Sequence, residues 1–216
     1  MRSISASPRL TREERKTQTR ERLLETARDV LLERGYNAAT LDGIALAAGV
    51  TKGAVYSNFT SKADLFLAVL DARSQRRTPA FERARAAAGT LDDLARQHAR
   101  NAVADDPDGR WASVLVEAWA AAVDDEPFRD ALRARTRAGN AVVGEHVLEI
   151  AERCGVEIPF PIGSVSQAGG AMLRGLLLQR LIDPERVSEE FVEEAFAALV
   201  RGLVRPVSGG SDDDRP

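Results

Sequence analysis

Apolar residues recur every three or four positions through most of the chain, a spacing that predicts a protein built almost entirely of helices. Glycine and proline stand mostly at the boundaries of these segments, and no run of alternating β-branched residues indicates a strand. The first helices are expected over residues 17–35, 40–48 and 51–58, and a longer one opens at Ser61, which forms a capping box with Asp64. The pattern therefore predicts an all-α fold of about nine helices.

Longer helices are expected after residue 63. Thr90 and Asp93 form a second capping box ahead of a helix over 91–104, and a further helix carries Trp111 and Trp119. Pro127 fits the first turn of a helix that runs to about residue 154. The last two helices are expected over 164–182 and 188–204.

Residues 40–59 fit two short helices joined by a tight glycine turn, the helix-turn-helix pattern. Gly49 can take the positive φ that the turn needs, and Thr51 caps the second helix. Val50 and Val55 can be buried between the helices, which leaves Thr51, Lys52, Gly53, Tyr56 and Ser57 facing outward. A plain helical hairpin with a glycine turn fits the same pattern.

The charge is divided unevenly along the chain. The net charge is −3, but residues 1–62 hold 11 Lys and Arg against 7 Asp and Glu, a net of +4, and the remainder carries −7. Such asymmetry favours a partner with phosphates at the N-terminal end. A solvated helical face would also explain it.

The residues of this segment also carry a resemblance. The run from Gly49 to Phe66, with its turn glycine, the cap Thr51, Tyr56 followed by Phe59, and Ser61-Lys62, resembles the DNA-binding signature of the tetracycline-repressor (TetR/AcrR) family of bacterial regulators. Residues 23–48 look like that family's first two helices. The resemblance covers about residues 17–70; beyond them, only length and helix count agree.

The resemblance implies a sequence-specific regulator of transcription, with residues 40–62 against operator DNA. Thr40 and Lys62 would meet phosphates, and the start of the recognition helix would reach base edges or phosphates. The sequence departs from the family pattern in two places, at the pair Asp42-Gly43 and at Asn58. Phe59 is expected in the core. The expected DNA-binding residues are Thr40, Thr51, Lys52, Gly53, Tyr56, Ser57, Asn58 and Lys62.

The resemblance also implies that the rest of the chain binds an effector and forms a homodimer. We divide the chain into a flexible basic arm (1–16), a helix-turn-helix domain (17–62), an effector-binding and dimerisation domain (63–207) and a disordered tail (208–216). An apolar pocket for a small apolar effector is possible here, although aromatic residues at helical spacing also form ordinary cores. The candidate ligand residues are Phe81, His98, Trp111, Leu115, Trp119, Phe128 and His146.

The last two expected helices suggest a dimer interface, because the helix over 164–182 is more apolar than one buried face requires. Two such helices from each subunit can form a four-helix bundle, although both could instead lie inside one monomer. The candidate interface residues are Met172, Leu173, Leu176, Leu177, Phe191, Phe196 and Leu199.

Other functional classes find little support. The single cysteine, Cys154, excludes an intramolecular disulfide and a cysteine-based zinc cluster, and neither His98 nor His146 lies in a zinc motif. We expect no catalytic site, metal or cofactor, and a soluble cytoplasmic protein without a membrane segment. The expected function is a repressor released from a palindromic operator by its ligand; the alternative is a helical adaptor that does not bind DNA.

Overall fold

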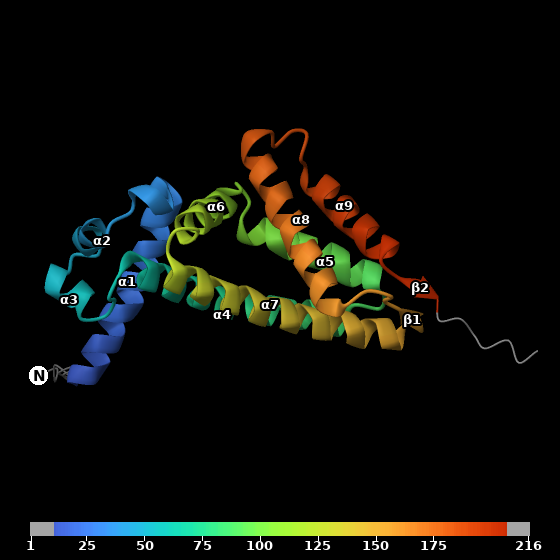
Figure 1. Cartoon of the computed structure of the whole chain (residues 1–216), viewed down its shortest axis with the longest axis horizontal. Coiled ribbons are helices and arrows are strands. Elements are labelled where there is room, and N and C mark those ends of the chain that lie inside the picture. Colours follow the sequence, from blue (N-terminus) through green and yellow to red (C-terminus); the bar gives the residue numbers. More distant parts are fainter. Residues whose placement is uncertain (1–10, 207–216) are drawn as a thin grey trace, which may run out of the picture. The chain divides into compact units, whose positions relative to one another are not determined.

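The computed structural model describes residues 11–206, and this part of the chain is helical almost throughout (Figure 1). Its nine helices are α1 (Arg12–Ala38), α2 (Leu41–Ala47), α3 (Lys52–Tyr56), α4 (Lys62–Ala87), α5 (Leu91–Asp105), α6 (Arg110–Ala122), α7 (Glu126–Arg153), α8 (Ile162–Ile182) and α9 (Glu189–Gly202). The all-α prediction is confirmed. Within residues 11–206, every helix is too short or too polar to span a bilayer.

One small element was not predicted. The strands β1 (Val156–Glu157) and β2 (Arg205–Pro206) pair antiparallel just after α7 and α9. Gly155, with φ of +64°, turns the chain into β1. Two residues per strand are too few to leave an alternating pattern in the sequence, so periodicity could not reveal them.

The first helix begins earlier than the sequence analysis expected. The Thr11 hydroxyl accepts a hydrogen bond from the Glu14 amide (3.1 Å), and the Glu14 carboxylate accepts one from the Thr11 amide (2.6 Å). This capping box starts α1 at Arg12, so residues 12–16 are helical rather than part of a flexible arm. The rest of the expected arm, residues 1–10, and the expected tail, 208–216, lie outside the described residues.

The chain divides into two compact units, the first ending at Arg73 and the second beginning at Ser74. We expected the boundary at Lys62. It lies further along the chain because the first turns of α4 belong to the core of unit 1. Phe66 is 1% exposed, and its ring packs edge-on against Tyr36 with centroids 5.1 Å apart. Leu65 and Val69 are equally buried.

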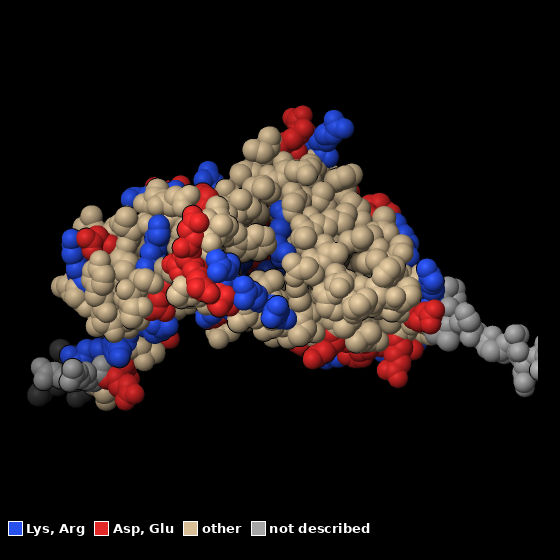
Figure 2. Space-filling view, in the orientation of Figure 1, with Lys and Arg blue, Asp and Glu red and all other residues tan. Residues whose placement is uncertain are grey.

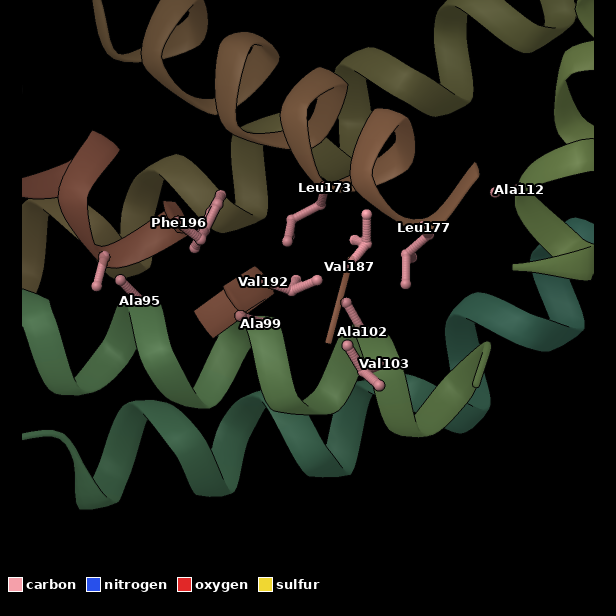
Figure 3. Packing of buried hydrophobic residues seen from close by; sticks show 11 residues of the cluster. Ala95, Ala99, Ala102, Val103, Ala112, Leu173, Leu177, Val187, Val192 and Phe196 are labelled. Carbon is pink, nitrogen blue, oxygen red and sulfur yellow. The ribbon is translucent and has the colours of Figure 1, made fainter. Parts of the chain in front are cut away.

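Unit 2 is built around a core shared by α5, α8 and α9 (Figure 3). Small residues of α5 allow the helices to approach, and larger side chains of α8 and α9 fill the space above them. Its buried members are Ala95, Ala99, Ala102, Val103, Ala112, Leu173, Leu177, Val187, Val192, Phe196 and Ala197.

The loop between α5 and α6 is held by a buried carboxylate and a glycine. Asp106 is 4% exposed and accepts hydrogen bonds from the amides of Trp111 and Ala112, both at 2.9 Å, which caps α6. Gly109 has φ of +66°, and a Cβ there would lie 2.0 Å from the Leu177 carbonyl oxygen of α8. Only glycine fits this turn against α8.

We therefore expect Gly109→Ala to destabilise the protein by more than about 2 kcal/mol, since left-handed strain alone costs about 1–2 kcal/mol and the backbone clash adds to it. Gly139→Ala in α7 is the matched control, because a Cβ there meets nothing within 4 Å. Its stability should be unchanged or raised by up to about 1 kcal/mol. Urea unfolding checks both; equal stabilities would contradict this account of the loop.

Candidate functional site

The candidate DNA-binding element is α3, a helix of five residues that its neighbours hold in place. Gly49 has φ of +65°, as the sequence predicted, and turns the chain between α2 and α3. Thr51 caps α3 by accepting a hydrogen bond from the Ala54 amide at 3.2 Å. Val55 points inward and is fully buried, and Phe59 is 1% exposed, as expected for a core residue. One face of α3 is thus fixed in the core and the other is free.

The free face carries most of the residues predicted to meet DNA. Thr51, Lys52, Gly53 and Tyr56 are all exposed. Around Gly53, a Cβ would have only the Thr51 hydroxyl nearby, at 4.0 Å. Packing within the chain therefore does not require glycine at this position, and the backbone stays open to close approach by a partner.

Thr40 caps α2 by accepting a hydrogen bond from the Gly43 amide at 3.0 Å. A Cβ on Gly43 would lie 3.0 Å from that Thr40 hydroxyl oxygen. The glycine that departs from the family pattern therefore leaves room for the cap. The Thr40 hydroxyl remains on the exposed surface of unit 1.

Asp42 has a role that the sequence analysis missed. Its carboxylate accepts a hydrogen bond from the Lys52 ammonium at 2.5 Å and a long one of 3.5 Å from the Tyr56 hydroxyl. The hydrogen bond and the charge of Asp42 raise the pKa of Lys52. Asp42 thus links α2 to the outer face of α3 and orients two of its candidate DNA contacts. No sequence signal shows this pairing, because the residues lie ten and fourteen positions apart on different helices.

Ser57 and Asn58 are less free than expected. The Ser57 hydroxyl and the Asn58 amide nitrogen both donate to the Ala54 carbonyl, at 2.9 and 2.8 Å. These bonds satisfy a carbonyl at the end of α3, and Asn58 is partly buried. Donation from the Ser57 hydroxyl to a phosphate would compete with this end cap, because the hydroxyl has one hydrogen.

Lys62 is placed differently from its predicted role at a phosphate. Its ammonium donates to the carbonyls of Tyr36 (3.1 Å) and Asn37 (3.2 Å) and lies 4.4 Å from the centre of the Tyr36 ring. Both carbonyls lie in the last turn of α1, directly after the kink at Gly35, which has φ of 79° and ψ of 169°. The structure therefore engages Lys62 in holding the end of α1 to the start of α4.

Some of the candidate ligand residues of unit 2 come together around His98. The Phe81 ring centroid lies 4.3 Å from that of His98, and the Phe196 ring stacks at 6.3 Å. Burial, with smaller contributions from Arg77 and His146, lowers the pKa of His98 to about 3, so the imidazole is neutral near pH 7. His146 is 9% exposed and lies 3.5 Å from the Glu82 carboxylate.

The other candidate ligand residues lie on or near α6. Trp111 and Phe128 are 5% and 3% exposed and serve as core, and Leu115 is partly buried. Trp119 is 38% exposed and has the Arg174 guanidinium 4.9 Å from the centre of its ring. The three residues spaced along α6 therefore do not share one environment.

Two family models match this chain. The model of bacterial regulatory proteins of the tetR family matches residues 23–69, and the model of the BetI-type transcriptional repressor C-terminal domain matches residues 92–205, more than half of the chain. The chain belongs to the TetR family of bacterial regulatory proteins.

Curated relatives match this TetR-family chain in its N-terminal part. The repressor BepR of Brucella suis is 49% identical over 53 residues, which are 24% of this chain and 25% of BepR. The activator FasR of Mycolicibacterium smegmatis is 50% identical over 62 residues, 29% of this chain and 26% of FasR. The chain thus spans about a quarter of the length of these relatives.

Solved structures share the fold over nearly the whole chain. A TetR-family regulator from Rhodococcus superposes with a TM-score of 0.70 at 18% identity, covering 86% of this chain and 98% of the other. The fatty acid degradation regulator FadR of Bacillus halodurans gives 0.71 at 18% identity, covering 86% and 96%. At this identity the likeness concerns the fold alone.

The candidate interface residues of this TetR-family chain separate into two groups. Leu173, Leu177 and Phe196 are 6–8% exposed and lie in the core of unit 2 (Figure 3), so they do not form an exposed face as expected. They are buried because α8 and α9 pack on α5. Met172, Leu176 and Leu199 are partly buried, and Phe191 is 50% exposed. Leu181 and Ile182, at the end of α8, are 37% and 81% exposed.

The pairing of Asp42 with Lys52 predicts an effect on DNA binding. Asp42→Asn frees the ammonium to neutralise a phosphate, so the slope of log affinity against log salt on a random duplex should steepen by about one. Asp29→Asn is the matched control, since it removes the same charge from an exposed residue that pairs with Arg28 instead. Fluorescence anisotropy across a salt series checks this; equal slopes for the two variants would contradict it.

The lowered pKa of His98 predicts acid sensitivity. His98 binds a proton near pH 6.5 in the unfolded chain and only near pH 3 in the folded one. The contribution of neutral His98 to stability is therefore fully present above pH 6.5 and is lost as the pH drops. Between pH 7 and 5, protonation of His98 in the unfolded chain should lower the free energy of unfolding by up to about 2 kcal/mol. His98→Phe should lose less stability over that interval in urea unfolding at fixed protein concentration. An equal loss in variant and parent would show that His98 is not the group responsible.

Proposed function

We propose that this protein is a sequence-specific DNA-binding regulator of transcription that acts as a homodimer on a palindromic operator. The observation that carries the proposal is the exposed face of α3. It presents the Thr51 hydroxyl, the Lys52 ammonium, an open backbone at Gly53 and the Tyr56 phenol on a helix whose opposite face is fixed in the core. Such a set offers donors to phosphates and to base edges in the major groove.

Repression is the proposed sign of regulation. The C-terminal match is to a family of transcriptional repressors, and BepR is named a repressor, although FasR is named an activator. A bound repressor excludes other proteins from the DNA that it covers. Release then requires a ligand with different affinities for the DNA-bound and free states, because a ligand can shift the equilibrium only by that difference.

A second copy of the chain would cover the apolar residues that α8 and α9 leave at the surface of unit 2. These are Phe191, Leu181 and Ile182. Met172, Leu176 and Leu199 on the same two helices are partly buried. Exposed apolar side chains that gather on neighbouring helices are typical of an interface. A two-fold dimer places two recognition helices in successive major grooves, which is why a palindromic operator is proposed.

The effector is proposed to bind within unit 2, among α4 to α9. Residues 63–207, the predicted effector-binding and dimerisation domain, would then bind the ligand. The unit that carries α1 to α3 would bind DNA. The aromatic cluster around His98 and the half-exposed Trp119 offer apolar surfaces for a small molecule. No enzymatic step is needed for this mechanism.

The proposal predicts that Lys52→Ala and Tyr56→Ala each weaken binding to the operator by at least about tenfold, since a lost charge-assisted or base contact is worth about 1–3 kcal/mol. Both side chains are exposed, so folding should be unaffected. Arg34→Ala is the matched control, because this exposed arginine of unit 1 pairs with Glu33 rather than with α2 or α3. Mobility shifts with DNA flanking the gene measure the affinities. Normal binding by both variants would show that α3 is not the recognition element.

A further inference from the structure

Arg174 of α8 is a partly buried cation of unit 2 for which the described residues provide no ion pair. Its Nε and Nη2 atoms are shielded from solvent and have no hydrogen-bond partner among the described residues. Burial lowers the pKa of its guanidinium. Buried polar groups in native proteins are nearly always paired, and an unpaired buried charge costs stability. A guanidinium in this state is suited to bind an anionic ligand.

The surroundings of Arg174 form a cradle for its guanidinium. The Trp119 ring of α6 lies against it, 4.9 Å from ring centre to guanidinium carbon. Gly170 lies one turn earlier on α8, and a Cβ there would approach the Arg174 Nη1 to 3.1 Å. The absence of a side chain at Gly170 lets the guanidinium fold back along its own helix and remain beside the indole.

Arg174 lies on a different side of α8 from the residues that face the core of unit 2. Leu173 and Leu177 point into the core with α5 and α9, whereas Arg174 contacts α6. Figure 2 shows the surface of unit 2 hollowed between α6, α7 and α8, with basic side chains along the hollow.

We propose that Arg174 and Trp119 form the anchor of an effector site for an amphipathic carboxylate. The planar guanidinium matches a carboxylate with two parallel hydrogen bonds, and the half-exposed indole offers an apolar surface to the body of the same molecule. This inference rests on the proposed ligand-controlled function and changes its effector from an apolar molecule to an organic anion.

Arg180 provides a matched control in the same helix. Its guanidinium donates to the carbonyls of Pro107 (3.1 Å) and Val187 (2.6 Å) and so holds the loops around α8. Arg180→Met removes those bonds and should lower the melting temperature. Arg174→Met removes an unpaired charge from a buried place, so the melting temperature should stay the same or rise. A guanidinium with a purely structural role would give a clear loss in both variants.

The test measures ligand binding to the purified full-length protein without DNA. Benzoate, 1-naphthoate and decanoate are each compared with the corresponding neutral amide, and inorganic phosphate serves as an anion without an apolar body. Tryptophan fluorescence reports binding, because Trp119 is one of two tryptophans in the chain. At least one carboxylate should bind about tenfold more tightly than its amide. Arg174→Met should abolish that preference, and Arg180→Met should retain it.

Three outcomes would overturn the proposal: no carboxylate preferred over its amide, a preference that survives in Arg174→Met, or a clear loss of stability in Arg174→Met. Failure of the proposed DNA-binding function is a separate result, because these measurements contain no DNA. A carboxylate that binds through Arg174 without releasing the protein from DNA would leave the site intact and contradict its assigned regulatory role.

Discussion

The structure of unit 1 depends on the anchoring of α3 to the core through its buried face. A helix of five residues is not stable by itself in water. Nucleation of a helix costs more free energy than its few hydrogen bonds provide. Val55, which is fully buried, and Phe59, three residues after the end of the helix, provide that anchor. Gly49 provides the turn between α2 and α3. Burial of these residues therefore also fixes the position of the exposed face of α3.

Electrostatics within unit 1 refine what the core establishes. Asp42 brings Lys52 and Tyr56 together on one side of α3, and Lys62 holds the end of α1 to the start of α4. Of Lys52 and Lys62, only Lys52 therefore remains at the outer surface. An acidic residue at position 42 lowers the charge that faces a phosphate but fixes the direction of the remaining donors. We infer that such an arrangement gives up non-specific attraction in favour of orientation.

Local signals in the sequence were sufficient for the helices and their caps. Thr90 with Asp93 and the turn at Gly49 appear where the sequence predicts them. Partners distant in sequence were not predictable, as Asp42 with Lys52 and Lys62 with Tyr36 show. The side of α8 that faces the core could not be predicted either. This helix is apolar on most sides, so periodicity does not show which side meets α5. Leu173 and Leu177 were accordingly assigned to a dimer interface, although they lie in the core.

Affinity for DNA flanking the gene, compared with a random duplex of equal length across a salt series, tests the central claim most directly. The account predicts saturable binding at least about 10³-fold tighter to the specific site, with log affinity falling linearly as log salt rises. Equal affinity for both duplexes at every salt concentration would contradict sequence-specific recognition by α3. No binding even at low salt would favour a helical adaptor that does not bind DNA.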